Sequence, residues 1–435
     1  MADHNVVVVD VVVVGAGIAG LTAARDLAMG GLSVLLLEAS GSVGGKVSSH
    51  TVAGVELDAG AESFATRGDT VAALVRELGL ADDLVSPNPA GAWLYRADGT
   101  SHPLPRTGLL GIPGSPMAAD VIGVIGYAGA FRAQLDALIP GVVGARETHF
   151  GALVRKRMGR RVLDRLVAPV VSGVHSRHPD DLEVDRVAPG LRSALRQNDS
   201  LARAVLALRA QAPAGAAVGG LSGGIHRLAA ELHRDVSAFG GETRFDCSVR
   251  SVDAEGVTTA AGERITARHA VFTSAAATGG SPIVLATLVL DLPGLDSAPR
   301  GTGLLVEPGS TTVAARALTH GTAKWSWLAE SAGEHRHVLR LSYDATRIGS
   351  GSLAEQARTD AQTLLGVPVP AGSIEGFARV EWLSSPTADA VPDGVIAIGE
   401  SVAGTGLAAV VAQARREAGS LLSELAGTPP GPEDD

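Results

Sequence analysis

The sequence is poor in cysteine, lysine and aromatic residues, and it has no long uncharged apolar run. The single cysteine, Cys247, excludes a disulfide framework and any zinc site built from cysteines. The longest mildly apolar stretch, residues 121–131, lies between Asp120 and Arg132. It is shorter than the roughly 20 residues that a membrane-spanning helix needs, so the sequence predicts no transmembrane segment.

Positive charge is also scarce, since the formal net charge is −10. This balance argues against a general nucleic-acid binder. The first four residues carry no basic region, so a strand accounts for the following valine run better than a signal peptide does. We therefore expect a cytoplasmic protein. Its basic helical segment, 155–165, reads most simply as a solvated face, with weak peripheral contact to an anionic membrane as the alternative.

The composition is otherwise typical of a globular α/β protein, with 46% hydrophobic and 19% charged residues. A length of 435 residues exceeds one ordinary core and predicts two or three lobes. Apolar runs and helical spacing predict strands at 11–14 and 33–37 and helices at 18–29 and 71–80. Residues 101–116 hold four prolines and are expected to form a loop.

Further elements are predicted along the rest of the chain. They are a mostly helical segment at 117–210, short strands within 244–272, strands of a second sheet at 283–290, 303–306 and 337–342, a strand at 394–398 and a helix at 407–425.

A glycine-rich motif, GAGIAG at 15–20, lies between the first predicted strand and the first predicted helix. In this context Gly15 permits a tight turn, Gly17 lets a pyrophosphate approach the backbone, and Gly20 allows close helix–strand packing. Glu38 ends the second predicted strand, where its carboxylate can accept hydrogen bonds from ribose hydroxyls. The motif predicts a dinucleotide site, and on this evidence both NAD and FAD remain open.

Three later motifs distinguish the two cofactors. GGK at 44–46 follows Glu38, LDAGAESF spans 57–64, and GVIAIGE at 394–400 leads into GTGLA at 404–408. Together they resemble the FAD-dependent amine oxidase superfamily, in which a last strand delivers a glycine-rich turn to the flavin.

Middle segments resemble one branch of that superfamily, the bacterial coproporphyrinogen III and protoporphyrinogen oxidases. The segments are GAESFATR at 60–67, APVVSGVH at 168–175, GTGLLV at 301–306, Lys324–Trp325 and VLRLS at 338–342. The resemblance implies the six-electron oxidation of coproporphyrinogen III to coproporphyrin III in haem biosynthesis, with O2 as acceptor and three H2O2 released. It assigns no catalytic side chain, because the chemistry rests on holding the macrocycle against the flavin.

The resemblance also implies the site residues. FAD would be non-covalent, because no cysteine lies near the C-terminal motif. Arg67 and Gly173 are the implied substrate-binding residues, since the arginine fork suits propionate carboxylates. The implied cofactor-binding residues are Gly15, Ala16, Gly17, Ile18, Ala19, Gly20, Glu38, Ala39, Gly44, Gly45, Lys46, Gly60, Ala61, Glu62, Ser63, Val249, Trp382, Gly399, Glu400, Gly404, Thr405, Gly406 and Leu407.

The fold class expected is α/β: a Rossmann-like, doubly wound FAD-binding domain assembled from discontinuous segments, with a mixed-sheet substrate domain and a helical lobe. The predicted boundaries are 1–88, 215–285 and 378–435 for the FAD-binding domain, 89–107 and 286–377 for the substrate domain, and 108–214 for the helical lobe.

Alternatives stay open at this point. Protoporphyrinogen IX is a second substrate, and an amine oxidase or polyene desaturase is a second class, although 3% aromatic residues argue against an aromatic amine cage. Residues 383–390 lack the usual A-L-P-x-Y stretch, which leaves a non-catalytic FAD- or porphyrin-binding protein open. His335 and His337 have no third partner in view, so no metal site is predicted. Transient contact with a ferrochelatase-like enzyme is a further partner to consider.

Overall fold

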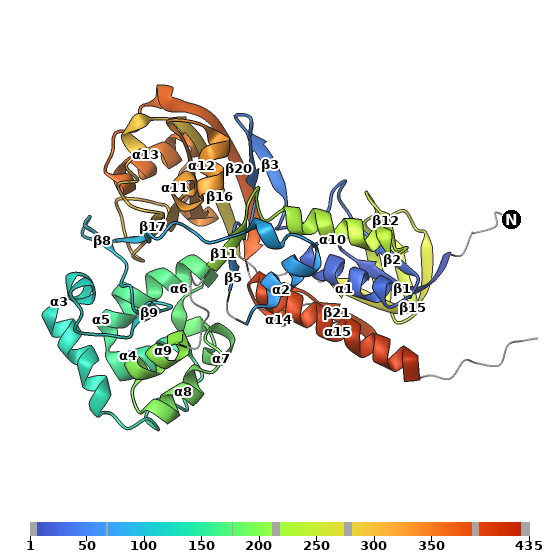
Figure 1. Cartoon of the computed structure of the whole chain (residues 1–435), viewed down its shortest axis with the longest axis horizontal. Coiled ribbons are helices and arrows are strands. Elements are labelled where there is room, and N and C mark those ends of the chain that lie inside the picture. Colours follow the sequence, from blue (N-terminus) through green and yellow to red (C-terminus); the bar gives the residue numbers. More distant parts are fainter. Residues whose placement is uncertain are drawn as a thin grey trace, which may run out of the picture.

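A computed structural model describes residues 7–66, 68–175, 177–210, 218–273, 281–384 and 391–427. The chain forms three lobes, which we name the first sheet, the second sheet and the helical lobe (Figure 1). The small strands β5 (Phe64–Ala65) and β11 (Val218–Leu221) lie where the three lobes meet. They pair with each other, and β11 also pairs with β6 (Leu84–Val85).

The first sheet is built around β1 (Val7–Val14), which runs parallel to β2 (Val34–Leu37) and β15 (Arg264–Thr273). Residues 11–13 of β1 have no exposed surface, as the apolar run predicts for a strand buried on both faces. The other strands of this sheet are β12 (Glu242–Arg244), β13 (Val249–Asp253), β14 (Gly256–Thr259) and β21 (Val395–Ile398).

Four helices pack with one face of the first sheet into one apolar cluster, because their buried stripes meet Val11, Val13 and Leu36. They are α1 (Ile18–Met29), α2 (Thr70–Glu77), α10 (Arg227–Ala238) and α15 (Leu407–Gly427). Short elements nearby are η1 (Ala81–Asp83) and α14 (Glu400–Ala403).

The second sheet is mostly antiparallel and has the order β20-β16-β19-β18-β17-β7-β8. Its long strands are β16 (Ser281–Asp291), β19 (Arg336–Asp344) and β20 (Ile374–Ser384), and its short ones are β18 (Ala317–His320), β17 (Gly303–Val306), β7 (Trp93–Tyr95) and β8 (Ser101–Pro103). Helix α13 (Leu353–Leu365) packs with one face, and the helices α11 (Gly321–Lys324) and α12 (Ser326–Ala332) lie along β19. The hairpin of β3 (Ser49–Val52) and β4 (Val55–Asp58) joins α12 in a separate apolar cluster. The short helices η5 (Pro293–Leu295), η6 (Ala345–Arg347) and η7 (Ala371–Ser373) connect the strands.

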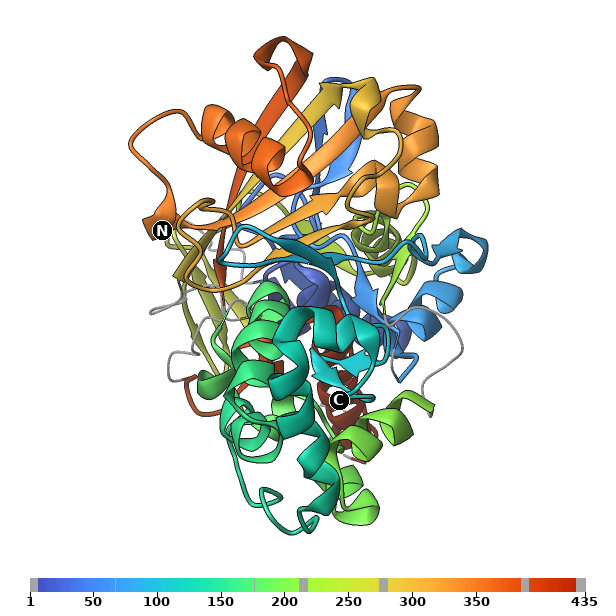
Figure 2. The same cartoon turned by 90° about the vertical axis from the view of Figure 1, so that its left-hand side faces the viewer.

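The helical lobe lies below the second sheet in Figure 2. Its elements are β9 (Gly108–Leu109), β10 (Ile112–Pro113), α3 (Ala119–Gln134), η2 (Leu135–Leu138), α4 (Phe150–Met158), α5 (Arg160–Val162), the π-helical turn η3 (Leu163–Val167), α6 (Ala168–His175), η4 (Pro179–Asp181), α7 (Val184–Val187), α8 (Leu191–Asn198) and α9 (Leu201–Ala210). Within the described residues, no helix is both long enough and apolar enough to cross a bilayer.

One fully buried ion pair anchors the helical lobe. Arg157 on α4 donates from Nε to Asp136 at 2.5 Å, and both side chains are at most 1% exposed. The remaining nitrogens of Arg157 donate to the carbonyl oxygens of Pro140, Val143, Asp136 and Asp199. The basic segment at 155–165 is therefore not a uniformly solvated face, because Arg157 is a core residue.

Most element predictions agree with the structure. The helix predicted at 18–29 is α1, and the strands predicted at 303–306 and 337–342 lie in β17 and β19. The loop predicted at 101–116 is wrong in part, because β8, β9 and β10 lie within it. Two-residue strands such as β9 and β10 leave too short a pattern to be recognised against four prolines. The domain boundaries stay a prediction.

We expect Arg157→Ala to lower the free energy of unfolding by about 3–5 kcal/mol, because Asp136 is left buried without its charge partner. Urea unfolding followed by circular dichroism measures the change. The matched control is Arg160→Ala on the neighbouring helix, whose side chain is 85% exposed and should change stability by less than about 0.5 kcal/mol. Equal effects of the two substitutions would contradict this account of the lobe.

Candidate cofactor and substrate site

The glycine motif forms a tight turn between β1 and α1. Gly15 has φ +96°, and a Cβ added to Gly20 would lie 1.9 Å from the carbonyl oxygen of Gly15. Side chains are therefore sterically excluded at both positions. A Cβ added to Gly17 would meet nothing within 4 Å, and no side chain caps α1 at this residue. Open space thus lies before the helix N-terminus, as phosphate binding requires.

Glu38 lies beside this turn at the end of β2. One carboxylate oxygen accepts a hydrogen bond from the Ala16 N–H at 2.7 Å, and the other accepts from the Ser40 N–H at 2.9 Å. The carboxylate thus ties Ala39 and its neighbours to the glycine turn. The Cys247 N–H donates to the Glu38 carbonyl at 2.9 Å, which brings the start of β13, at Val249, towards the same end of the sheet.

The loop that contains Gly44 and Gly45 pairs with the glycine motif at 15–20. The Gly44 N–H donates to the Ala16 carbonyl at 2.8 Å, and Gly17 and Gly44 form an isolated parallel bridge. Lys46 follows directly, and its Nζ lies 2.6 Å from Glu400 and 2.7 Å from the Leu383 carbonyl. Lys46 therefore connects this loop to the C-terminal motif.

Residues 60–63 lie against the same loop. The Ala61 N–H donates to the Lys46 carbonyl at 2.9 Å. A Cβ on Gly60 would lie 2.2 Å from that carbonyl oxygen and 3.2 Å from Nε1 of Trp382. The Trp382 indole N–H in turn donates to the Ala59 carbonyl at 3.3 Å. Ser63 is half-buried at the end of this segment.

The C-terminal turn completes the cradle. Gly399 follows β21 with φ +104°, and its added Cβ would lie 3.6 Å from Ala19. Gly404 and Gly406 also have positive φ, and added Cβ atoms there would meet nothing within 4 Å. Thr405 lies between them, and Leu407 begins α15. These contacts bring the predicted residues of four separate loops together around open space, which suits a dinucleotide bound mainly by backbone.

A buried ion triad beside this cradle was not predicted from the sequence. Glu62 lies 2.6 Å from Lys324 Nζ and 2.9 Å from Arg340 Nη2, and the three side chains are 14–17% exposed. Burial alone would raise the pKa of Glu62, but Arg340 and Lys324 outweigh it and lower the pKa to about 2. Arg340 also donates to the Gly60 carbonyl at 2.8 Å. The sequence signals were that Lys324 is among only three lysines and that Glu62, Lys324 and Arg340 each lie in a segment that resembles the oxidases.

Of the two residues predicted to bind substrate, the structure describes only Gly173. Gly173 lies in α6, within the segment predicted to be mostly helical, and its added Cβ would lie 2.6 Å from the Leu305 side chain on β17. It therefore marks a close approach of the helical lobe to the second sheet. Arg67 and residues 385–390 lie outside the described residues.

His335 and His337 both hydrogen-bond Asp296, at 2.7 and 3.0 Å. Among the residues that the structure describes, no group of three or more His, Cys, Asp or Glu is arranged to hold a metal ion.

The chain is similar to known proteins in both sequence and fold. Residues 18–379 match the family described as flavin containing amine oxidoreductase. The chain belongs to this family. A solved "Putative protoporphyrinogen oxidase" from Exiguobacterium sp. 255-15 superposes with a TM-score of 0.79 at 21% identity, over 95% of this chain and 99% of that one, and it supports the fold.

Curated relatives share more sequence identity with the chain, about 30%. The coproporphyrinogen III oxidase of Propionibacterium freudenreichii is 31% identical over 196 residues, which are 45% of this chain and 37% of that protein. The chain thus matches well under half of that relative's length. The coproporphyrinogen III oxidase of Mycobacterium tuberculosis is 29% identical over 388 residues, which are 82% of each chain. These matches show a flavin-dependent oxidoreductase family with porphyrinogen oxidases among its members.

We expect Glu62→Gln to lower the free energy of unfolding by about 3 kcal/mol at pH 7, because two buried cations lose their counter-charge. The wild-type carboxylate stabilises the fold fully above its unfolded pKa of 4.5 and loses that contribution as the pH falls towards 2. The gap between wild type and variant should therefore narrow below pH 4.5, as measured by denaturant unfolding at several pH values. Glu334→Gln, at a side chain that is 88% exposed, is the control. A gap that does not change with pH would contradict the assignment.

Proposed function

We propose that the protein is an FAD-dependent oxidase that converts coproporphyrinogen III to coproporphyrin III in the cytoplasm. The observation that carries this proposal is the match over 82% of both chains to a protein named coproporphyrinogen III oxidase. Membership of the flavin containing amine oxidoreductase family supports the flavin.

The glycine cradle supports FAD as the bound form of that flavin. Gly17, Gly404 and Gly406 leave open space where backbone can meet a ligand, and Lys46 adds a positive charge next to Glu400. The flavin is held without a covalent bond to cysteine in this proposal, because the only cysteine, Cys247, precedes β13 and does not belong to the C-terminal turn at 399–407. When bound, FAD supplies the two-electron acceptor for each of three rounds, and O2 regenerates it with release of H2O2.

The protein's own contribution is positioning and charge. Arg340 and Lys324 hold Glu62, and through it the 60–63 segment, between the two sheets. Two cations against one carboxylate leave an excess positive charge in a largely water-free place, which favours anionic groups nearby. We assign substrate propionates to Arg67 and close contact with the macrocycle to the surface around Gly173. No nucleophile or metal is required for this oxidation.

The direct test is porphyrin fluorescence after the FAD-loaded protein receives coproporphyrinogen III or protoporphyrinogen IX in air, against an enzyme-free control. We expect faster emission with coproporphyrinogen III. A preference for protoporphyrinogen IX would keep the chemistry and change the substrate. No enhancement with either substrate, despite bound FAD, would overturn the proposal and point to amines, polyenes or a non-catalytic role.

We expect Arg67→Ala to raise the KM for coproporphyrinogen III about tenfold or more with FAD content unchanged, because a charge-assisted hydrogen bond to a propionate contributes about 1.5–3 kcal/mol. Steady-state kinetics and the flavin absorbance per protein measure the two quantities. Arg268→Ala is the control, since that side chain is 71% exposed on β15 of the first sheet. An unchanged KM would remove Arg67 from the substrate pocket.

A further inference from the structure

Arg316 joins the second sheet to the helical lobe. Its Nη1 lies 2.7 Å from Asp344 at the end of β19, and its Nη2 donates to the Ser172 carbonyl of α6 at 3.3 Å. Within the described residues, no other hydrogen bond connects these two lobes. The Arg316 side chain is only 17% exposed, so water competes little for its partners. The polar connection between the lobes therefore rests on one guanidinium.

The backbone of Arg316 is held in place by several contacts. Its N–H donates to the Ser342 carbonyl at 2.8 Å, and its carbonyl accepts from the Val306 N–H at 2.9 Å. Just before it in the chain, the N–H groups of residues 314–315 donate to buried Asp360 on α13 at 3.1 and 2.9 Å. A side chain on a backbone fixed in this way has little freedom to move, so the guanidinium is held close to α6.

The contact reaches the last turn of α6. Ser172 directly precedes Gly173, and an added Cβ on Gly173 would lie 2.6 Å from the Leu305 side chain. Carbonyl oxygens at the end of a helix lack partners within the helix, and they form the negative end of its dipole. A guanidinium donated by the second sheet therefore stabilises the end of α6 where this helix contacts that sheet.

The sheet face next to α6 extends to the buried ion triad. In the strand register, Leu305 of β17 lies opposite Ala317 of β18, and Ala317 lies opposite Ser342 of β19. Directly opposite residues point to the same face of a sheet, and all three of these side chains are half-buried. Arg340 of the triad is two residues from Ser342 on β19, so its side chain shares this face. One half-exposed face thus connects α6 with the surroundings of the cofactor cradle.

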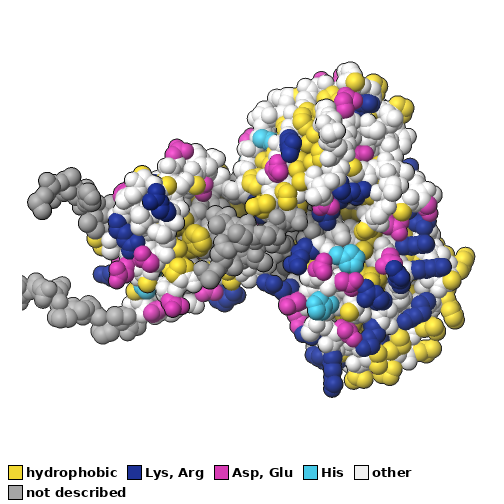
Figure 3. Space-filling model, turned by 180° about the vertical axis from the view of Figure 1, so that it is seen from behind, with side chains coloured by type: hydrophobic (Ala, Val, Ile, Leu, Met, Phe, Trp, Pro, Cys, Tyr) yellow, Lys and Arg dark blue, Asp and Glu magenta, His cyan; other side chains and the backbone are white. Residues whose placement is uncertain are grey.

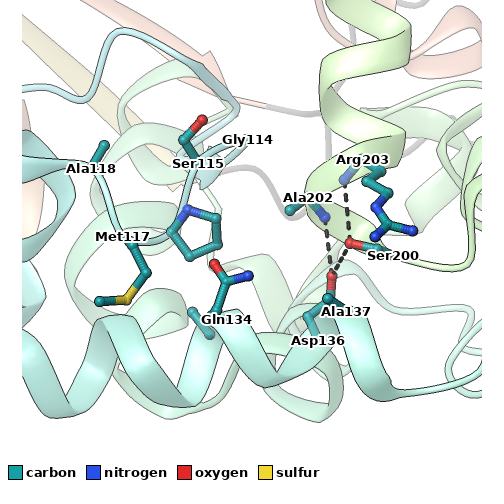
Figure 4. Close-up of a pocket in the computed structure, with 12 residues that line it drawn as sticks. Gly114, Ser115, Met117, Ala118, Gln134, Asp136, Ala137, Ser200, Ala202 and Arg203 are labelled. Carbon is teal, nitrogen blue, oxygen red and sulfur yellow. Dashed lines mark hydrogen bonds between the residues drawn. The ribbon is translucent and has the colours of Figure 1, made fainter.

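The helical lobe is held together by its own contacts. Beside an open cavity that is lined only by residues of this lobe, one Asp136 oxygen accepts from Ser200 Oγ and the Ala202 N–H at 2.8 and 3.1 Å (Figure 4). Arg157 pairs with the other oxygen of the same carboxylate. These contacts favour movement of the lobe as a unit, so a tie at α6 sets the position of the whole lobe.

Other basic side chains of the helical lobe do not replace this tie. Figure 3 shows many Lys and Arg side chains on the outer surface of that lobe. Their ion pairs among the described residues stay within the lobe, as for Arg155 with Asp180, Lys156 with Glu147 and Arg192 with Asp185. The polar connection is therefore supplied by the second sheet.

We infer that Arg316 is a positioning residue for the oxidation. It sets the gap between α6 and the face of the second sheet that carries Leu305 and Ser342, and the planar macrocycle lies in this gap. Arg316 acts through α6 and does not touch the reacting atoms. Small displacements in such a gap change the rate strongly, because catalysis rests on holding the macrocycle against the flavin. This inference rests on the proposed function.

The first measurement is amide hydrogen exchange of the full-length, FAD-loaded protein without substrate. Arg316→Ala should make the amides of residues 168–175 exchange about tenfold faster, because the end of α6 loses its tie and opens more often. Arg316→Lys should restore part of the protection, since an ammonium can reach the Ser172 carbonyl but lacks the fork that also holds Asp344. Unchanged exchange in Arg316→Ala would overturn the positioning role, because a residue that only binds substrate leaves the free protein unaltered.

The second measurement is the steady-state oxidation of coproporphyrinogen III. Arg316→Ala should raise the KM about tenfold, the order of magnitude that one hydrogen bond from a charged group contributes. Arg316→Lys should give an intermediate KM. Flavin absorbance per protein and the melting temperature should stay close to those of the wild type, because the tie is remote from the glycine cradle and the lobe has its own core.

Arg358→Ala is the matched control. The Arg358 side chain is 23% exposed and also holds one carboxylate and one carbonyl, those of Glu355 and Val369, but it lies on α13 on the other face of the second sheet. It should change neither exchange at 168–175 nor the KM. An active wild type with an unchanged KM in Arg316→Ala, or an equal effect of Arg358→Ala, would overturn this inference alone. An inactive wild type would overturn the proposed function and the role in catalysis with it.

Discussion

The buried ion triad of Glu62, Lys324 and Arg340 is the interaction on which the arrangement of the lobes most depends. It joins a loop that belongs with the first sheet to a helix and a strand of the second sheet. Buried charges need partners with good geometry, because their desolvation costs several kcal/mol each. The two sheets therefore cannot slide past each other without exposing at least one uncompensated charge, and the 60–63 segment keeps its place.

The cradle next to this triad depends on small residues where backbones cross. Gly20, Gly44 and Gly60 each touch a carbonyl oxygen or its neighbours so closely that a side chain would force the loops apart. Lys46 then adds a tie to Glu400 across more than three hundred residues of sequence. The site is assembled by tertiary contacts among four loops, and each loop is short enough to be rigid once its neighbours are present.

Local features of the fold and the cradle could be predicted from the sequence, because a glycine motif between a buried strand and a helix predicts a dinucleotide site. The pairing of Glu62 with two cations could not be predicted, since the three residues lie in separate motifs far apart in sequence and no motif shows which side chains meet. Arg157 shows the same limit: in a run of basic residues, only the tertiary structure distinguishes the buried arginine from its exposed neighbours. Gly173 was expected to bind substrate, and only the structure shows that it also lies where α6 contacts Leu305 on β17.

The pairing of β15 with β21 has a consequence for how the protein is made. Residues 270–273 of β15 receive their partner strand from 395–398, and α1 receives α15 from 407–427. During translation, β21 and α15 are synthesised only after the second sheet and the helical lobe. During most of translation, the first sheet therefore has an unpaired strand edge and an uncovered apolar helix, which are the features that chaperones bind and that misassembled chains share. The cofactor cradle is therefore completed only after the second sheet and the helical lobe have been synthesised.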